Sequence, residues 1–264
     1  MRDSAATGCL TMVTSTGMAS IIAEKIGFIQ MTEVEIVIKP EKAHQLAKVL
    51  VSVWGGADSI PPDVIIAIIQ AGGYASLASQ IANGKKQFVG GSLAIVGSHQ
   101  GKLHSHVTGV IPSAINSGVG RALKDHQWSW AKENEFSTIS WTFDPLVRRN
   151  AYFNLIVLGA NVVKYCQNYY GEINDLINAG DQTDRLVVER QVKGLTVAPS
   201  GSLCVANGDD LIIQTPPDIV SLRNTDRETA NRLRLEQRIS FESAFANSFS
   251  VQGLTGDGSF VMMR

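Results

Sequence analysis

The chain has 264 residues, of which 44% are hydrophobic and 18% are charged. Its 23 Lys and Arg side chains nearly balance its 24 Asp and Glu side chains, so the formal net charge is −1. This balance argues against a strongly basic nucleic-acid-binding protein, and the hydrophobic content excludes a disordered chain. The length is that of one large domain, or of one domain with a smaller second one.

The cysteines and the apolar segments indicate the cellular compartment in which the protein is expected. The 3 cysteines lie far apart in the sequence, and they give neither a disulfide framework nor a zinc signature. No stretch reaches the roughly 18 uninterrupted apolar residues of a membrane helix. Residues 1–30 also lack the clean apolar block of a secretory signal. We therefore expect a cytoplasmic protein with no membrane partner, in which residues 1–31 are a poorly specified extension.

From residue 33 onward, strand and helix patterns follow one another clearly. Asn83-Gly84 is the strongest short signal for a hairpin turn, and a glycine-bearing loop at 116–120 opens a helix. The predicted order is β-α-α-β-β-β-α-β-α-β-β. In chain order, we predict a strand at 33–38, helices at 40–54 and 61–71, strands at 74–81, 87–96 and 103–110, a helix at 121–134, a strand at 137–143, a helix at 145–158, and strands at 162–165 and 185–190.

The C-terminal part has a different composition. Residues 191–209 are rich in Gly, Ser and Val and indicate a linker with one strand at most. After an apolar segment at 211–213, Thr225-x-x-Glu228 has the pattern of a capping box that begins a helix. Alternating residues on either side of a Gly-Asp-Gly turn at 256–258 predict a closing hairpin. Five arginines share this region with interleaved acidic residues, which indicates a salt-bridged solvent face. They are Arg223, Arg227, Arg232, Arg234 and Arg238.

The segment from Val110 to Leu123 carries the clearest chemical signal. A strand delivers the chain to a glycine-bearing loop, and the loop opens a helix whose first amides have no partner within the helix. Such amides can hold a phosphate. An ordinary strand–loop–helix turn fits the loop at least as well when the loop is taken alone. The spacing Gly118-x-Gly120 matches neither a dinucleotide fingerprint nor a P-loop.

The surroundings of this loop resemble a known family. Val110-x-Pro112, Gly118-x-Gly120 and the following 121–123 resemble motif A of the GNAT acetyltransferase superfamily. Ala151 and Leu158-Gly159-Ala160 resemble motif B, and shorter motifs resemble a little-characterised branch with a C-terminal extension. The resemblance implies a GNAT-like α/β (α+β) fold, with a mixed, splayed central sheet flanked by helices. It places an acetyltransferase domain at 32–190 and a small β-α-β extension at 191–264.

The resemblance also implies acetyl-CoA as the acyl donor, with no metal. The acceptor would be a small-molecule or peptide amine that attacks the thioester directly; a homodimer is left open, and no nucleic-acid partner is expected. Arg148, Arg149 and Asn150 begin a helix, where an acidic substrate group, a CoA phosphate or Asp144 could be their partner; a solvated surface explains them about equally well. The implied cofactor-binding residues are Gly109, Val110 and Ile111 for pantetheine, Asn116, Ser117, Gly118, Val119, Gly120 and Arg121 for the diphosphate, and Asn150.

The candidate acid–base residues are His104, His106, Asp144 and Tyr152. The two histidines are two apart on a predicted strand and so share one face, where they could relay a proton. A half-exposed polar face explains them equally well, and a metal site is less favoured because no third ligand lies near. Asp144 fits a turn carboxylate slightly better than a catalytic one.

Two positions depart from the superfamily. Ile115 stands where Gln or Arg is usual, and Leu155 stands where a Tyr usually protonates the thiolate. Tyr152 lies about one helical turn from Leu155 and is expected on a similar face. These departures motivate an alternative function, in which the chain is a non-catalytic CoA-binding or protein-interaction module that retains the fold.

Overall fold

The structure is a computed structural model that describes residues 31–55, 60–99, 101–171 and 181–264. Thr32–Arg264 form one compact unit, which holds every element described below. The extension predicted at 1–30 lies outside the described residues. Among the described residues, every helix is too short or too polar to cross a bilayer.

The first half of the compact unit follows the sequence prediction closely. Hydrophobic spacing places Leu46 and Leu50 on the buried face of one helix, and Asn83 and Gly84 take the positive φ angles of the expected hairpin turn. The hairpin is therefore confirmed. The elements are β1 (Glu33–Ile36), α2 (Pro40–Trp54), α3 (Pro62–Gln70), β2 (Tyr74–Ala82), β3 (Lys85–Val96) and β4 (Lys102–Val110).

The next segment differs from the prediction at one helix. The helix expected at 145–158 begins only at Arg148, because the Asp144 side chain accepts a hydrogen bond from the Leu146 amide and holds a turn there (3.0 Å). After Tyr152 the helix widens into a single π turn. The elements are α4 (Val119–Glu133), β5 (Thr138–Phe143), α5 (Arg148–Tyr152), the π turn η2 (Phe153–Val157), β6 (Asn161–Cys166) and β7 (Arg185–Gln191).

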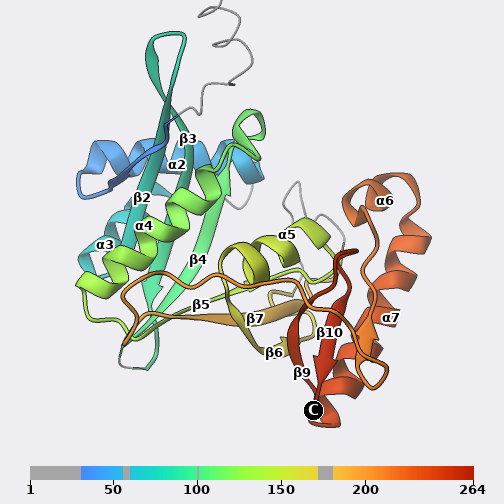
Figure 1. The fold of residues 1–264 in the computed structure, drawn as a ribbon. Helices are drawn as coiled ribbons and strands as arrows, with labels where there is room; N and C mark the ends of the chain where they lie inside the picture. The colour runs from blue at the N-terminus through green and yellow to red at the C-terminus, as the bar shows by residue number, and fades with distance from the viewer. Residues whose placement is uncertain (1–30, 56–59, 100, 172–180) are drawn as a thin grey trace, which may run out of the picture. The chain divides into compact units, whose positions relative to one another are not determined.

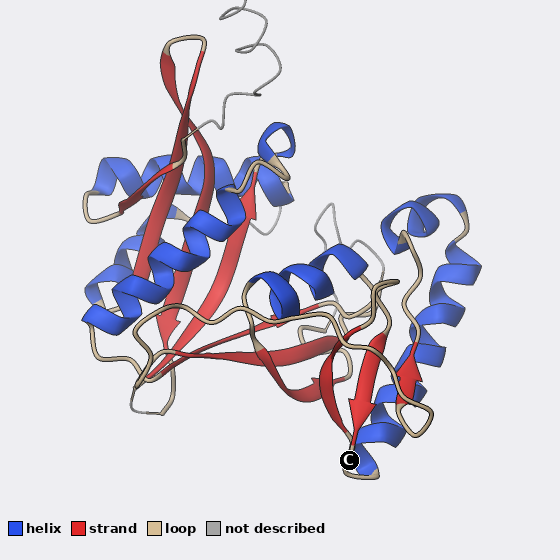
Figure 2. Ribbon diagram, viewed as in Figure 1, coloured by secondary structure: helices blue, strands red, loops and turns tan. Residues whose placement is uncertain are grey.

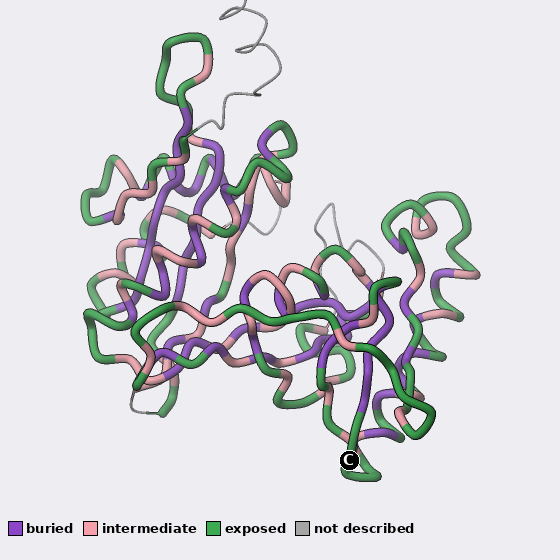
Figure 3. Tube along the Cα trace, in the orientation of Figure 1, coloured by how far each residue is buried: buried purple, intermediate pink, exposed green. Residues whose placement is uncertain are grey.

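These strands form one seven-stranded mixed sheet in the order β1-β2-β3-β4-β5-β7-β6. Every neighbouring pair is antiparallel except β4 and β5, which run parallel. α2 and α3 cover one face of the N-terminal strands, and α4 covers the opposite face (Figures 1 and 2). The buried residues run along the central strands between these helices (Figure 3). The mixed sheet flanked by helices confirms the predicted fold class.

The C-terminal part adds a second, three-stranded sheet in the order β8-β10-β9. Phe241 joins it to the main sheet, because its ring packs against Phe260 on one side and Tyr165 on the other. After β7 ends at Gln191, residues 192–209 contain no further strand, although the sequence allowed one in this segment. The elements are β8 (Leu211–Ile213), α6 (Ile219–Thr225), α7 (Arg227–Ala246), β9 (Ser250–Leu254) and β10 (Phe260–Met263).

The expected capping box is wrong by one residue. Thr225 is the last residue of α6, and Asp226 caps α7 by accepting a hydrogen bond from the Thr229 amide (3.0 Å). The proposed solvent face of arginines is also wrong in part, since Arg234 and Arg238 are buried. The first error arises because α6 runs to Thr225 and α7 begins only after Asp226. The second arises because Arg234 and Arg238 form ion pairs with Asp144 and Asp184, which lie far from them in the sequence.

Candidate functional site

The loop before α4 leaves the start of that helix open. Gly118 is the residue before the first turn, with φ at +85°, and no side chain caps the helix. A Cβ placed on Gly118 would meet nothing within 4 Å. The helix begins at Val119, two residues earlier than predicted, so the amides of Val119, Gly120 and Arg121 form its first turn. Amides at such a position carry partial positive charge and suit an anion such as a diphosphate.

A side chain that the sequence did not single out supports this loop. Gln80 on β2 is buried, and its amide group donates hydrogen bonds to the hydroxyls of Ser117 (3.3 Å) and Thr32 (3.0 Å). Ser117 in turn donates to the Ala114 carbonyl (2.7 Å). Ile115 is 38% exposed in the same loop. The loop is thus held from a neighbouring strand, which a local sequence pattern cannot show.

The parallel strands β4 and β5 are joined over only a short stretch. Their register runs from Lys102 opposite Thr138 to His104 opposite Ser140 and then stops. β4 continues to Val110 and β5 to Phe143, so the two strands separate beyond the last pair. We call the space where they separate the β4–β5 split. Along it, one edge of the β4 backbone from Ser105 onward has no strand partner among the described residues.

Close packing holds the end of β4 and the residue that follows it. The ring of Trp54 on α2 lies against Gly109, where an added Cβ would come within 2.4 Å of it. The Ile111 amide is already bonded to the Val89 carbonyl (2.9 Å) on the β3 side. Three residues are expected to pair with pantetheine. Gly109 is held by α2 and Ile111 by β3, and Val110 lies between them.

The two histidines lie where β4 meets the split. The β3–β4 register shifts between Leu93 and Ala94, which pair with Val107 and Ser105, so His106 is the extra residue of a β-bulge. His104 is hydrogen-bonded through Nδ1 to the Ser140 hydroxyl (3.3 Å). Loss of hydration lowers the pKa of both imidazoles, His104 at a half-buried position and His106 at a more exposed one, and the charges of His106 and Lys124 lower the pKa of His104 further. Both rings are therefore neutral and able to accept a proton at neutral pH.

The structure places Asp144 in a buried ion-pair cluster away from the histidines. Arg234 binds both carboxylate oxygens (2.7 and 2.8 Å), and Arg223 binds one of them (2.5 Å). Burial by itself would raise the pKa of Asp144, but the bonds and charges of these arginines outweigh it and hold the pKa well below its usual range. Asp144 therefore stays ionised near neutral pH, and its bond to the Leu146 amide fits the turn carboxylate that the sequence slightly favoured. A catalytic role for Asp144 stays a prediction.

The residues expected to act from the motif B helix do not lie together. Tyr152 is 47% exposed, whereas Leu155 is buried. The π turn that begins at Phe153 changes the angle between them, so they do not share a face as the sequence suggested. Arg148 reaches the Thr215 carbonyl, and the Asn150 carbonyl accepts a bond from Asn154 (2.8 Å). The roles of Tyr152 and Asn150 stay predictions.

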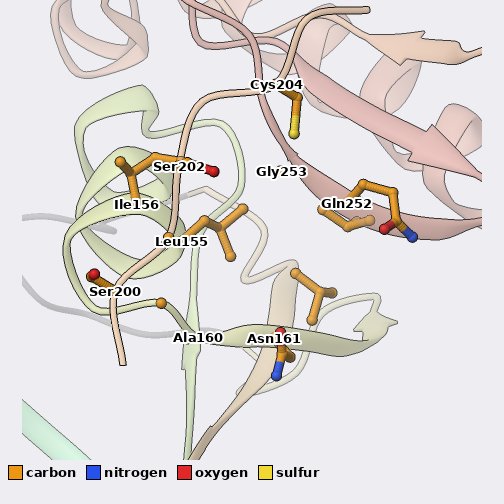
Figure 4. Close-up of a pocket in the computed structure, with 13 residues that line it drawn as sticks. Leu155, Ile156, Ala160, Asn161, Ser200, Ser202, Cys204, Gln252 and Gly253 are labelled. Carbon is orange, nitrogen blue, oxygen red and sulfur yellow. The ribbon is translucent and has the colours of Figure 1, made fainter. Parts of the chain in front are cut away.

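A pocket of about 230 Å³ is lined by Leu155 and lies between η2, the start of β6, the segment 200–204 and β9 (Figure 4). Ser202, Asn161 and Gln252 give it polar groups, while Leu155 and Ile156 supply apolar ones. None of its lining residues comes from β4, β5 or α4, so it is distinct from the split. Among the described residues, no group of three or more His, Cys, Asp or Glu side chains is placed to hold a metal ion.

One further buried group was missed by the sequence analysis. Lys124 on α4 is 5% exposed, and its amine donates a hydrogen bond to the Ser105 hydroxyl on β4 (2.7 Å). The same amine lies 4.0 Å from the ring centre of Trp141 on β5. Helical spacing alone did not predict that Lys124 is buried, because the pattern does not say which strand residues face the helix.

Comparisons with known proteins address the fold. No family model and no curated protein gives a significant match. Solved structures do: NAA60 from Arabidopsis thaliana, in complex with a bisubstrate analogue, aligns with a TM-score of 0.51 and 11% identity, over 62% of this chain and 100% of that one. The ribosomal-protein-S18-alanine N-acetyltransferase from Escherichia coli aligns with 0.48 and 13%, over 68% and 98%. A protein from Desulfovibrio desulfuricans, assigned to the GNAT acetyltransferases, aligns with 0.46 and 15%, over 61% and 99%. The fold of this chain is the GNAT fold.

Proposed function

We propose that this chain, which has the GNAT fold, is an acyl-CoA-dependent N-acyltransferase that moves an acetyl group to an amine on a small molecule or peptide. The observation that carries the proposal is the β4–β5 split together with the uncapped start of α4. The split leaves a strand edge free for an extended, amide-bearing chain such as pantetheine, and the helix start suits its diphosphate. The two features follow one another within a single strand–loop–helix segment.

The residues of the loop fit the donor by their chemistry. Gly118 leaves room beside the backbone, and the amides of Val119, Gly120 and Arg121 are the expected diphosphate ligands. Asn116, at φ +67°, turns the chain toward this helix start. Val110 offers its backbone edge to pantetheine. Binding of the donor in this way would bring a thioester toward the β-bulge of β4, because pantetheine would run back along that strand.

The histidines supply the proton acceptor in this proposal. The amine nitrogen forms a bond to the acyl carbon as the carbon–sulfur bond breaks, and the nitrogen must lose one proton. His106 in the bulge, or His104 beside it, accepts that proton directly or through water, since loss of hydration keeps both rings neutral. Holding the amine and thioester together lowers the barrier further, because it removes the entropy cost of their encounter.

The test begins with calorimetric titration of acetyl-CoA. We expect binding to the unaltered protein and a loss of at least about tenfold in affinity for Gly120→Glu, which places a carboxylate at the helix start. Ser129→Glu is the matched control, since it adds the same charge on an exposed position of α4 away from that start. Absence of binding at millimolar acetyl-CoA, or equal losses in both variants, would contradict the proposal.

A second candidate function is a CoA-binding or interaction module without turnover. Leu155 favours it, because the buried position offers no hydroxyl to the thiolate. The two functions separate in an assay of CoA release over a broad panel of amines. Turnover that collapses in His104→Ala/His106→Ala supports the enzyme, whereas donor binding without turnover on any amine supports the module.

A further inference from the structure

Lys124 lies at the point where β4 and β5 begin to separate, which we call the apex of the split. His104 and Ser140 are the last residues that pair the two strands, so Ser105 and Trp141 are the first residues beyond the pairing. The Lys124 amine touches both of them, with 2.7 Å to the Ser105 hydroxyl and 4.0 Å to the Trp141 ring centre. A single amine therefore bridges the point at which the strands begin to separate.

The partners of this amine among the described residues are all neutral. Its remaining contact is the Gln127 side-chain oxygen at 3.4 Å, and Gln127 itself donates to the Ser92 hydroxyl (3.2 Å). Among the described residues, no carboxylate forms an ion pair with Lys124. A buried ammonium group that has only neutral partners is costly, because the hydration it loses is not replaced by an opposite charge.

The charged groups that face Lys124 make this cost larger. Burial lowers the pKa of its amine to about 7, and the positive charge of Arg190 on β7 contributes to the same shift. Arg190 is itself paired with Asp125 (3.0 Å), and it also donates to the Lys124 carbonyl (3.3 Å). His104 on β4 is the other titratable neighbour, and its pKa is lowered in part by Lys124. The amine thus exchanges its proton near neutral pH.

We propose that Lys124, held by Ser105 and Trp141 at the apex of the split, is the acid that protonates the departing thiolate. The inference rests on the proposed acyl transfer. The carbon–sulfur bond breaks, one N–H bond of the Lys124 ammonium breaks, and an S–H bond forms on CoA. The proton that leaves the substrate amine passes to His104 or His106, and exchange with solvent returns both side chains to their starting states. An anion that forms at the apex also supplies the opposite charge that the ammonium lacks.

The thiol of free CoA is the probe that tests this proposal without an acceptor amine. An ammonium beside a thiol stabilises the thiolate and lowers the pKa of the thiol. We expect ultraviolet titration of bound CoA to show a thiolate-to-thiol ratio at neutral pH about tenfold or more above that of free CoA, which is a shift of about one pKa unit. In Lys124→Met, the bound thiol should ionise as free CoA does.

Two further variants make the outcome decisive. Lys132→Met removes an exposed lysine that also lies over a tryptophan ring on the same helix, so the bound thiol should ionise as in the unaltered protein. Lys124→Gln keeps a hydrogen-bond donor for Ser105 without a charge, and it should behave as Lys124→Met. Equal thiol ionisation in the unaltered protein and both Lys124 variants overturns this inference alone. Failure of CoA to bind to the unaltered protein overturns the proposed function with it.

Discussion

Two buried cations in this chain have opposite surroundings. Arg234 in α7 is bonded to Asp144 through both carboxylate oxygens and to Asp181 at 2.9 Å. Lys124 in α4 has a hydroxyl, an amide oxygen and an aromatic ring, and among the described residues no carboxylate pairs with it. Both side chains are almost fully buried. The difference separates a charge that is neutralised within the fold from one that is not.

The paired cation belongs to a cluster that joins the C-terminal helices to the main sheet. Asp144 is the residue that follows β5, and Arg223 on α6 and Arg234 on α7 form ion pairs with it. Asp184 and Arg238 repeat the arrangement at the start of β7 (2.8 Å). Such pairs fix where α6 and α7 sit, because each charge would be left buried and alone if the helices moved. The unpaired cation instead lies beside the split, where a ligand would bring the missing charge.

The largest effect is expected from breaking the paired region. Asp144→Ala leaves Arg234 and Arg223 without their shared carboxylate, and we expect it to lower the free energy of unfolding by about 3–5 kcal/mol. Urea denaturation measures this loss. Asp218→Ala, which removes an exposed helix cap on α6, is the control and should cost about 1 kcal/mol. Equal losses in the two variants would show that the Asp144 carboxylate contributes no more than an exposed helix cap does.

Replacing the unpaired Lys124 should raise the free energy of unfolding, whereas Asp144→Ala lowers it. Replacing Lys124 by Met removes a buried charge, so we expect a gain in stability on the order of 3 kcal/mol below pH 7. The folded pKa of about 7 lies below the unfolded value near about 10.4. Between these values the unfolded chain binds more protons, so the stability of the unaltered protein rises with pH and the gain shrinks. Urea denaturation from pH 6 to pH 10 tests this, and a gain that does not change with pH contradicts it.

A smaller effect distinguishes the helix start that the sequence predicted from the one observed. Asp226→Ala removes the side chain that accepts from the Thr229 amide, so the melting temperature should fall measurably. Thr225→Ala should leave it nearly unchanged, because Thr225 ends α6 and its hydroxyl donates to the Ser221 carbonyl one turn earlier (3.0 Å). A larger fall in melting temperature for Thr225→Ala than for Asp226→Ala would support the capping box that the sequence suggested.

The smallest effect is expected on the exposed side of the same helix. Arg232 pairs with Glu236 one turn away at 2.8 Å, and both side chains are more than half exposed. We expect Arg232→Ala to lower the free energy of unfolding by only about 0.3–0.5 kcal/mol, and high salt should abolish the loss. A loss that persists at high salt would mean that this arginine also acts within the fold.

Most of the local structure could be predicted from residues that are close together in the chain. The strands β2 to β4, the turn at Asn83-Gly84 and the glycine-bearing loop before α4 were all predicted, because each depends on residues close together in the chain. The likeness to motif A was enough to place the candidate donor site on that loop. The sequence also identified His104 and His106 as neighbours on one strand.

The pairing of the buried charges could not be predicted, because it depends on contacts between distant segments. Asp144 and Arg234 are 90 positions apart, and Lys124 is 19 from Ser105, so local spacing does not say that they meet. The register of β4 with β5, which sets where the split begins, is likewise a contact between distant segments. Whether a charged side chain is neutralised or left to meet a ligand depends on what packs against it, and packing joins residues that the sequence keeps apart.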